Sequence, residues 1–122
     1  GAVQRECSYR KALCQLNLNK PKEARQNLAN LKPEPKDPYI HEYTVLVATL
    51  YIESMEYPAA DAVIASYIKS YPRGEAAQAS WLLSAYSLDG QGNTSGSRAS
   101  LKKAVELGPN TEIGKTAAQM LG

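Results

Sequence analysis

The sequence predicts an all-α fold, an α-solenoid of about three antiparallel helix pairs followed by a C-terminal capping helix. Three features that recur at matching intervals along the chain predict this fold. The first is a set of small residues at intervals of 36 and 37 residues, namely Ala24, Ala60 and Ser97. The second is a small residue twelve positions upstream of each, namely Ala12, Ala48 and Ala85. The third is a proline twelve positions after Ala60 and after Ser97, namely Pro72 and Pro109.

Close helix packing explains why these features recur together. Two antiparallel helices approach closely only where both present small side chains. A proline after the second helix cannot continue it and redirects the chain into the next pair. We therefore assign the 122 residues to a single domain. Its repeats cover approximately residues 5–36, 37–73 and 74–109, and its capping helix covers residues 111–121.

Local start signals place the first helices within this frame. The predicted helices, in order, cover residues 2–18, 21–32, 38–54, 58–71, 75–88, 96–107 and 111–121. Pro21 and Pro58 lie at helix starts, where a missing N–H removes no helical hydrogen bond. Asp37 followed by Pro38 is typical of an N-cap with proline at the first helical position. These residues indicate where the second, third and fourth helices begin.

The later helices are bounded by glycine. Residues 89–97 form the longest glycine-rich stretch and predict a flexible turn between two helices. Gly108 and Pro109 predict the end of the helix before them. Within the predicted capping helix, Gly114 lowers the helix propensity by up to about 1 kcal/mol relative to alanine.

Composition excludes several classes of protein. A hydrophobic content of 43% and a charged content of 21% are typical of a folded globular domain. No apolar run approaches the length of a membrane span, so we expect no direct membrane insertion. Basic residues cluster around residues 21–32, but no aromatic residue alternates with them, so we expect no nucleic-acid partner.

The residues that could carry chemistry do not converge in the sequence. His41 is the single histidine, and no nucleophile and base accompany it, so we expect no enzymatic activity. Cys7 and Cys14 are too far apart on one helix to form a disulfide with each other, and there is no CxxC motif. Residues 89–100 resemble a calcium loop only loosely, because Thr94 and Ser100 replace the required Gly and Glu. We therefore expect no metal and no cofactor.

The pattern of small, aromatic and proline residues resembles the tetratricopeptide repeat family. The third unit matches it best, through Trp81, Ala85, Leu88, Ser97, Leu101, Ala104 and Pro109. The second matches through Val47, Ala48, Tyr51, Ala60, Ile64 and Pro72, and the first is irregular. The segment SYIKSYPRGEAAQASWLLSAY is similar to repeats of Tol-Pal-associated and outer-membrane assembly lipoproteins. That similarity implies a bacterial cell-envelope or periplasmic location.

The resemblance implies a binding role. In this family the first helix of each pair lines a concave groove that holds a peptide or helix of a protein partner. The corresponding groove residues in this sequence are Tyr9, Leu13, Val45, Thr49, Ile52, Leu82 and Tyr86. None of them is a cation, so we predict no clamp for a peptide carboxylate.

Two alternatives remain open from the sequence. In the first, the groove holds no partner but packs against the chain's own termini or a neighbouring repeat. The chain is then a structural fragment of a longer array. In the second, copies of the chain self-associate through the irregular first pair, around Val3, Cys7 and Cys14.

Overall fold

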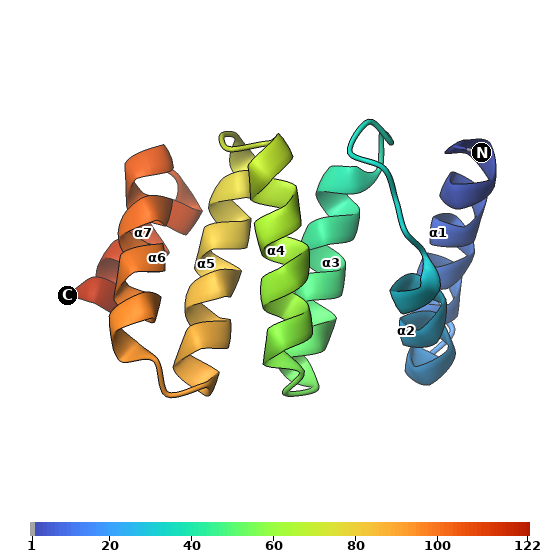
Figure 1. The fold of residues 1–122 in the computed structure, drawn as a ribbon, viewed down its shortest axis with the longest axis horizontal. Coiled ribbons are helices and arrows are strands. Elements are labelled where there is room, and N and C mark those ends of the chain that lie inside the picture. Colours follow the sequence, from blue (N-terminus) through green and yellow to red (C-terminus); the bar gives the residue numbers. More distant parts are fainter. Residues whose placement is uncertain (1) are drawn as a thin grey trace. The chain divides into compact units, whose positions relative to one another are not determined.

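The computed structural model describes residues 2–122, and these residues form seven α-helices and no strand (Figure 1). The helices are α1 (Ala2–Asn17), α2 (Pro21–Asn30), α3 (Ile40–Glu53), α4 (Tyr57–Ser70), α5 (Glu75–Gly90), α6 (Thr94–Leu107) and α7 (Glu112–Leu121). The predicted all-α class is confirmed. Every predicted helix is present, with ends that differ by at most two residues.

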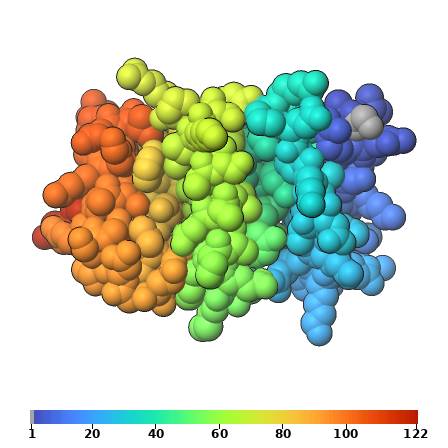
Figure 2. All heavy atoms as spheres, in the orientation of Figure 1, coloured from blue at the N-terminus to red at the C-terminus, as the bar shows by residue number. Residues whose placement is uncertain are grey.

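The chain divides into two compact units, residues 1–43 and 44–122, with the boundary inside α3. In unit 1, α1 packs against α2. In unit 2, α5 packs against α4, α6 and α7, and α6 also packs against α7. Side chains fill the space between the ribbons of α4, α5 and α6 (Figure 2).

The same turn recurs after α1, α3 and α5. In each turn a backbone N–H donates to the carbonyl five residues earlier. The three bonds run from Lys20 to Gln15, from Glu56 to Tyr51 and from Asn93 to Leu88, each with an N···O distance of 2.8 Å. The residue before each donor has a positive φ, at Asn19 (61°), Met55 (62°) and Gly92 (79°). This is the Schellman geometry that closes a helix by satisfying its last carbonyls.

The recurring turns have the same spacing as the small residues in the sequence. Both predicted sets of small residues are buried, with Ala12, Ala24, Ala48, Ala60 and Ala85 fully inaccessible to solvent and Ser97 nearly so. A methyl or hydroxymethyl side chain at these points lets neighbouring helices approach closely. The local structure therefore repeats with the period that the sequence predicts.

Two predicted details are wrong. Helix α3 begins at Ile40 rather than at 38, and the Asp37 carboxylate is bonded to Arg5 instead of capping a helix. The glycine-rich stretch 89–97 is mostly helical, because α5 extends to Gly90 and α6 begins at Thr94. Only three residues therefore lie between these helices. The last of them, Asn93, caps α6 by accepting a hydrogen bond from the Gly96 N–H.

Gly114 has a structural role that offsets its low helix propensity. It is buried in the first turn of α7. A Cβ atom at this position would collide with the Gly108 carbonyl oxygen. Glycine is therefore required where the start of α7 crosses the end of α6.

Candidate protein-binding surface

The outward face of α5 carries two of the predicted groove residues. Leu82 and Tyr86 are four residues apart, so they lie on the same face of the helix. The Leu82 side chain is half-buried and packs against the hydrophobic cluster that contains Ala85. Tyr86, in contrast, is 38% exposed. Glu75 and Asp89, both exposed, lie on the same face near the two ends of the helix. The face is therefore apolar and aromatic in the middle and acidic at its ends.

The part of α3 in unit 2 presents a similar mixture. Val45, Thr49 and Ile52 are half-buried, and Glu53 beside them is exposed. The Thr49 hydroxyl donates to the Val45 carbonyl at 2.7 Å. The methyl group of Thr49 is therefore the part of its side chain left for contact with a partner. This part of α3 therefore places an exposed acid at the end of a row of half-buried side chains.

Charge is distributed unevenly among the helices. Neither α3 nor α5 contains a lysine or arginine, whereas together they contain four carboxylates, at Glu42, Glu53, Glu75 and Asp89. The cations of unit 2 lie on α4, α6, α7 and the 71–74 connection, at Lys69, Arg73, Arg98, Lys102, Lys103 and Lys115. The faces of α3 and α5 thus favour cationic groups over anionic ones.

In unit 1, Tyr9 belongs to the core rather than to an open surface. It is 7% exposed and stacks on Tyr39, with ring centroids 4.8 Å apart. Its ring also makes an edge-to-face contact with Tyr43, with ring centroids 6.2 Å apart. Burial raises the pKa of the Tyr9 phenol. The neighbouring predicted residue, Leu13, is half-buried. Of the seven predicted groove residues, these two lie in unit 1 and the other five in unit 2.

A buried glutamine fixes the position of α5 against the next two helices. The Gln78 Nε2 donates to the carbonyls of Ala104 and Gly108, at 2.8 and 2.9 Å. Its Oε1 accepts from the Thr111 hydroxyl at 3.0 Å. Thr111 in turn caps α7 by accepting from the Gly114 N–H. A single side chain therefore ties the end of α6 and the start of α7 to α5.

A carboxylate fixes the other side of α5. The Asp61 carboxylate on α4 accepts from the Ser87 hydroxyl at 2.7 Å and from the Gln91 amide at 2.8 Å. Ser87 is fully buried. Together with the Gln78 bonds, these contacts hold the outward face of α5 in a fixed orientation.

An ion pair joins the start of α1 to the connection before α3 in unit 1. Arg5 donates to both oxygens of Asp37, at 2.7 and 3.0 Å, in a bidentate arrangement. The Glu34 N–H and the Tyr39 hydroxyl also donate to Asp37. The Arg5 bonds hold the pKa of Asp37 well below its usual range, despite burial. Burial, and next the charge of Asp37, raise the pKa of Tyr39 to about 12.

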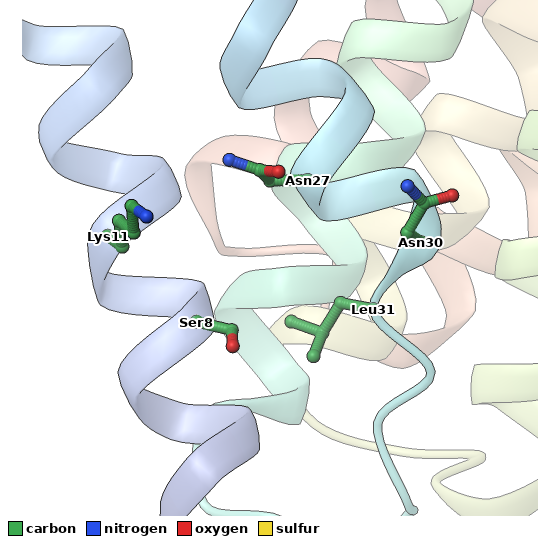
Figure 3. Close-up of a pocket in the computed structure, with 5 residues that line it drawn as sticks. All are labelled: Ser8, Lys11, Asn27, Asn30 and Leu31. Carbon is green, nitrogen blue, oxygen red and sulfur yellow. The ribbon is translucent and has the colours of Figure 1, made fainter.

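Unit 1 also contains an open pocket between α1 and α2 (Figure 3). Its volume is about 280 Å³, and its lining is mostly polar: Ser8, Lys11, Asn27, Asn30 and Leu31. Asn27 donates to the Gln15 side chain on α1 at 2.6 Å. The sequence did not indicate this pocket, because its residues come from two helices and form no motif.

Residues 2–122 contain no group of three His, Cys, Asp or Glu side chains placed to hold a metal ion. Within the same residues, no helix combines the length and the apolar character that crossing a membrane requires. Comparison of the sequence with known protein families and with curated proteins gives no match.

Proposed function

We propose that the chain is a tetratricopeptide-like interaction scaffold that binds a helix or peptide of a partner protein. The observation that carries this proposal is the Schellman turn that recurs at Asn19, Met55 and Gly92, in step with the buried small residues. A supersecondary unit repeated at this period is typical of helical repeat arrays, whose extended surfaces bind other proteins. The proposed role needs no catalytic group and no cofactor.

The faces of α3 and α5 define the chemistry of the proposed partner. Val45, Ile52, Leu82 and Tyr86 offer apolar contact, and the acids on the same helices attract cations. An amphipathic segment with apolar residues on one face and lysine or arginine at its edges satisfies both requirements. We therefore propose a basic amphipathic segment as the ligand, rather than an acidic one.

Tyr86 is the proposed anchor of this surface. A tyrosine offers a large apolar ring with few rotatable bonds, so little conformational entropy is lost when a partner covers it. The fixed orientation of α5, held by Gln78 and Asp61, means that the ring is presented without a rearrangement of the helix. Rigid presentation lowers the free-energy cost of binding.

The experiment uses a synthetic amphipathic peptide of leucine and lysine, about four helical turns long, and its counterpart with glutamate in place of lysine. We expect the basic peptide to bind in fluorescence anisotropy, more weakly as salt concentration rises. Glu75→Gln and Asp89→Asn should each weaken binding roughly two- to threefold. The control is Glu106→Gln on α6, which should leave affinity unchanged. Equal binding of both peptides would contradict the proposed chemistry.

A further inference from the structure

The face of α1 that points away from the core of unit 1 is apolar and uncovered. Val3 is 74% exposed and Leu18 70%, and Cys7 and Cys14 are both exposed and unpaired. At about 100° of rotation per residue, these four side chains lie within a sector of about 60°. Leu18 follows α1 directly and continues its hydrogen-bonding pattern by donating to the Cys14 carbonyl at 3.0 Å. The residues lie along one face of the helix, which we call the outer stripe of α1.

The outer stripe of α1 is complementary to itself. Val3 and Leu18 lie equally far in sequence from the midpoint between Arg10 and Lys11, and so do Cys7 and Cys14. When two copies of α1 are placed antiparallel about a two-fold axis through that midpoint, Val3 faces Leu18 of the second copy. Cys7 then faces Cys14 of the second copy. An isologous interface requires this kind of self-pairing.

The spacing of packed helices suits cysteines at these positions. Helices that pack closely have axes about 8–10 Å apart, and each Cα lies about 2.3 Å from its axis. Facing Cα atoms are then about 3–5 Å apart, which overlaps the Cα separation of disulfides, about 4.4–6.8 Å. Within one chain, the two cysteines are about 10 Å apart along the helix and cannot be joined. Only a second copy brings a partner sulfur within reach.

The charges beside the stripe lie on its opposite flanks. Arg10 pairs with Glu6 of its own chain at 3.2 Å, and Lys11 lines the pocket between α1 and α2. Both cations come close to the two-fold axis, so like charges of the two copies approach each other there. Screening by salt should therefore strengthen the association.

We propose that the outer stripe of α1 docks a second copy of this chain, with the two α1 helices antiparallel. The two-fold axis passes between Arg10 and Lys11, and Cys7 of each copy faces Cys14 of the other. Because one pair of helices makes a small interface, the dimer is weak and depends on protein concentration. This proposal is independent of peptide binding by α3 and α5, and either can fail alone.

Oxidative cross-linking tests the register. Diamide takes two electrons and two protons from a pair of facing thiols, an S–S bond forms, and the azo bond of diamide becomes a hydrazine. Wild-type chain should give a covalent dimer on a non-reducing gel. Cys7→Ser alone and Cys14→Ser alone should stay monomeric, because their remaining cysteines are about 10 Å out of register. A mixture of the two variants should give a cross-linked dimer, since Cys14 of one then faces Cys7 of the other.

A second pair of variants tests the apolar contact. Each variant keeps both cysteines and is fully reduced before diamide is added. Leu18→Glu should slow the cross-linking at least roughly tenfold, because it removes an apolar contact and places a charge in the interface. Met55→Glu is the matched control, since Met55 is similarly exposed, at 75% against 70% for Leu18, but lies in unit 2. Circular dichroism should show that both variants remain helical. Cross-linking of either cysteine variant alone, or an unchanged rate for Leu18→Glu, would overturn the proposal.

Discussion

Met55 and Gly92 occupy the same position in two turns of the chain, 37 residues apart, yet only one of them is glycine. Both have positive φ, 62° and 79°, and both precede a residue whose N–H closes the turn at 2.8 Å. A side chain in this left-handed conformation is strained, because Cβ crowds the following carbonyl oxygen. The chain therefore stores backbone strain at Met55 that it avoids at Gly92.

Replacing this methionine with glycine should stabilise the protein. Met55 is 75% exposed, so its side chain contributes little packing. We expect Met55→Gly to raise the free energy of unfolding by about 0.5–1 kcal/mol, measured by urea denaturation. Met55→Ala keeps the strained conformation and should differ from wild type by less than about 0.5 kcal/mol. A glycine variant less stable than the alanine variant would contradict this account of the turn.

Gln78 should be the polar side chain on which unit 2 depends most. Gln78→Ala removes the amide that donates to the carbonyls of Ala104 and Gly108, and only the Gly108 carbonyl keeps another side-chain donor, the Thr111 hydroxyl. We expect a loss of about 2–3 kcal/mol in the free energy of unfolding. Gln119→Ala, on the exposed side of α7, should change it by less than about 0.5 kcal/mol. Hydrogen exchange of the Gly114 and Ala117 amides should accelerate in the first variant, and unchanged exchange there would refute the proposed link.

The ion pair of Arg5 and Asp37 should make stability depend on acidity. Asp37 has a lower pKa in the folded protein than in the unfolded chain, where it is about 3.9. Its contribution is therefore complete above that value and decreases as pH falls toward the folded pKa. Urea denaturation between about pH 5 and pH 2 should show this loss.

The control for this pH dependence is Arg5→Met. Without the guanidinium, the pKa of Asp37 rises, and stability should decrease less between neutral and acidic pH. The side chain of methionine keeps much of the apolar contact of the arginine stem. An identical acid dependence in wild type and Arg5→Met would show that this pair does not set it.

Tyr39 should produce the opposite dependence at alkaline pH. Its pKa is raised to about 12 in the folded protein, compared with about 10 in the unfolded chain. Its contribution is present below about pH 10 and is lost as pH rises from there toward 12. Absorbance of ionised tyrosine should show a group that titrates near pH 12 in wild type and is missing in Tyr39→Phe. Titration of all tyrosines near pH 10 would contradict the buried contact with Asp37.

The sequence predicted the helices well because their boundaries are encoded locally. Pro21 and Pro58 lie in the first turns of α2 and α4, and Gly108 caps α6. The buried small residues followed from their spacing alone. Such features depend on neighbours a few residues away, so a single sequence is enough to recognise them.

Features that depend on distant partners were missed. Asp37 has the local pattern of an N-cap, but its carboxylate bonds to Arg5, 32 residues away. Tyr9 matches a groove position of the repeat pattern, but Tyr39 stacks on it and buries it. Gln78 is flanked by alanines in the sequence, and nothing near it indicates its carbonyl partners. A match to a groove position cannot show which side chains another segment covers.

The most direct test of the proposed binding surface compares two exposed side chains of unit 2. Tyr86 is 38% exposed and Met120 is 37% exposed, but only Tyr86 lies on the outward face of α5. Tyr86→Ala should weaken binding of the basic leucine–lysine peptide roughly tenfold without lowering the thermal midpoint. Met120→Ala should leave the affinity unchanged. Equal affinities for wild type and Tyr86→Ala, or equal losses in both variants, would contradict binding at this face.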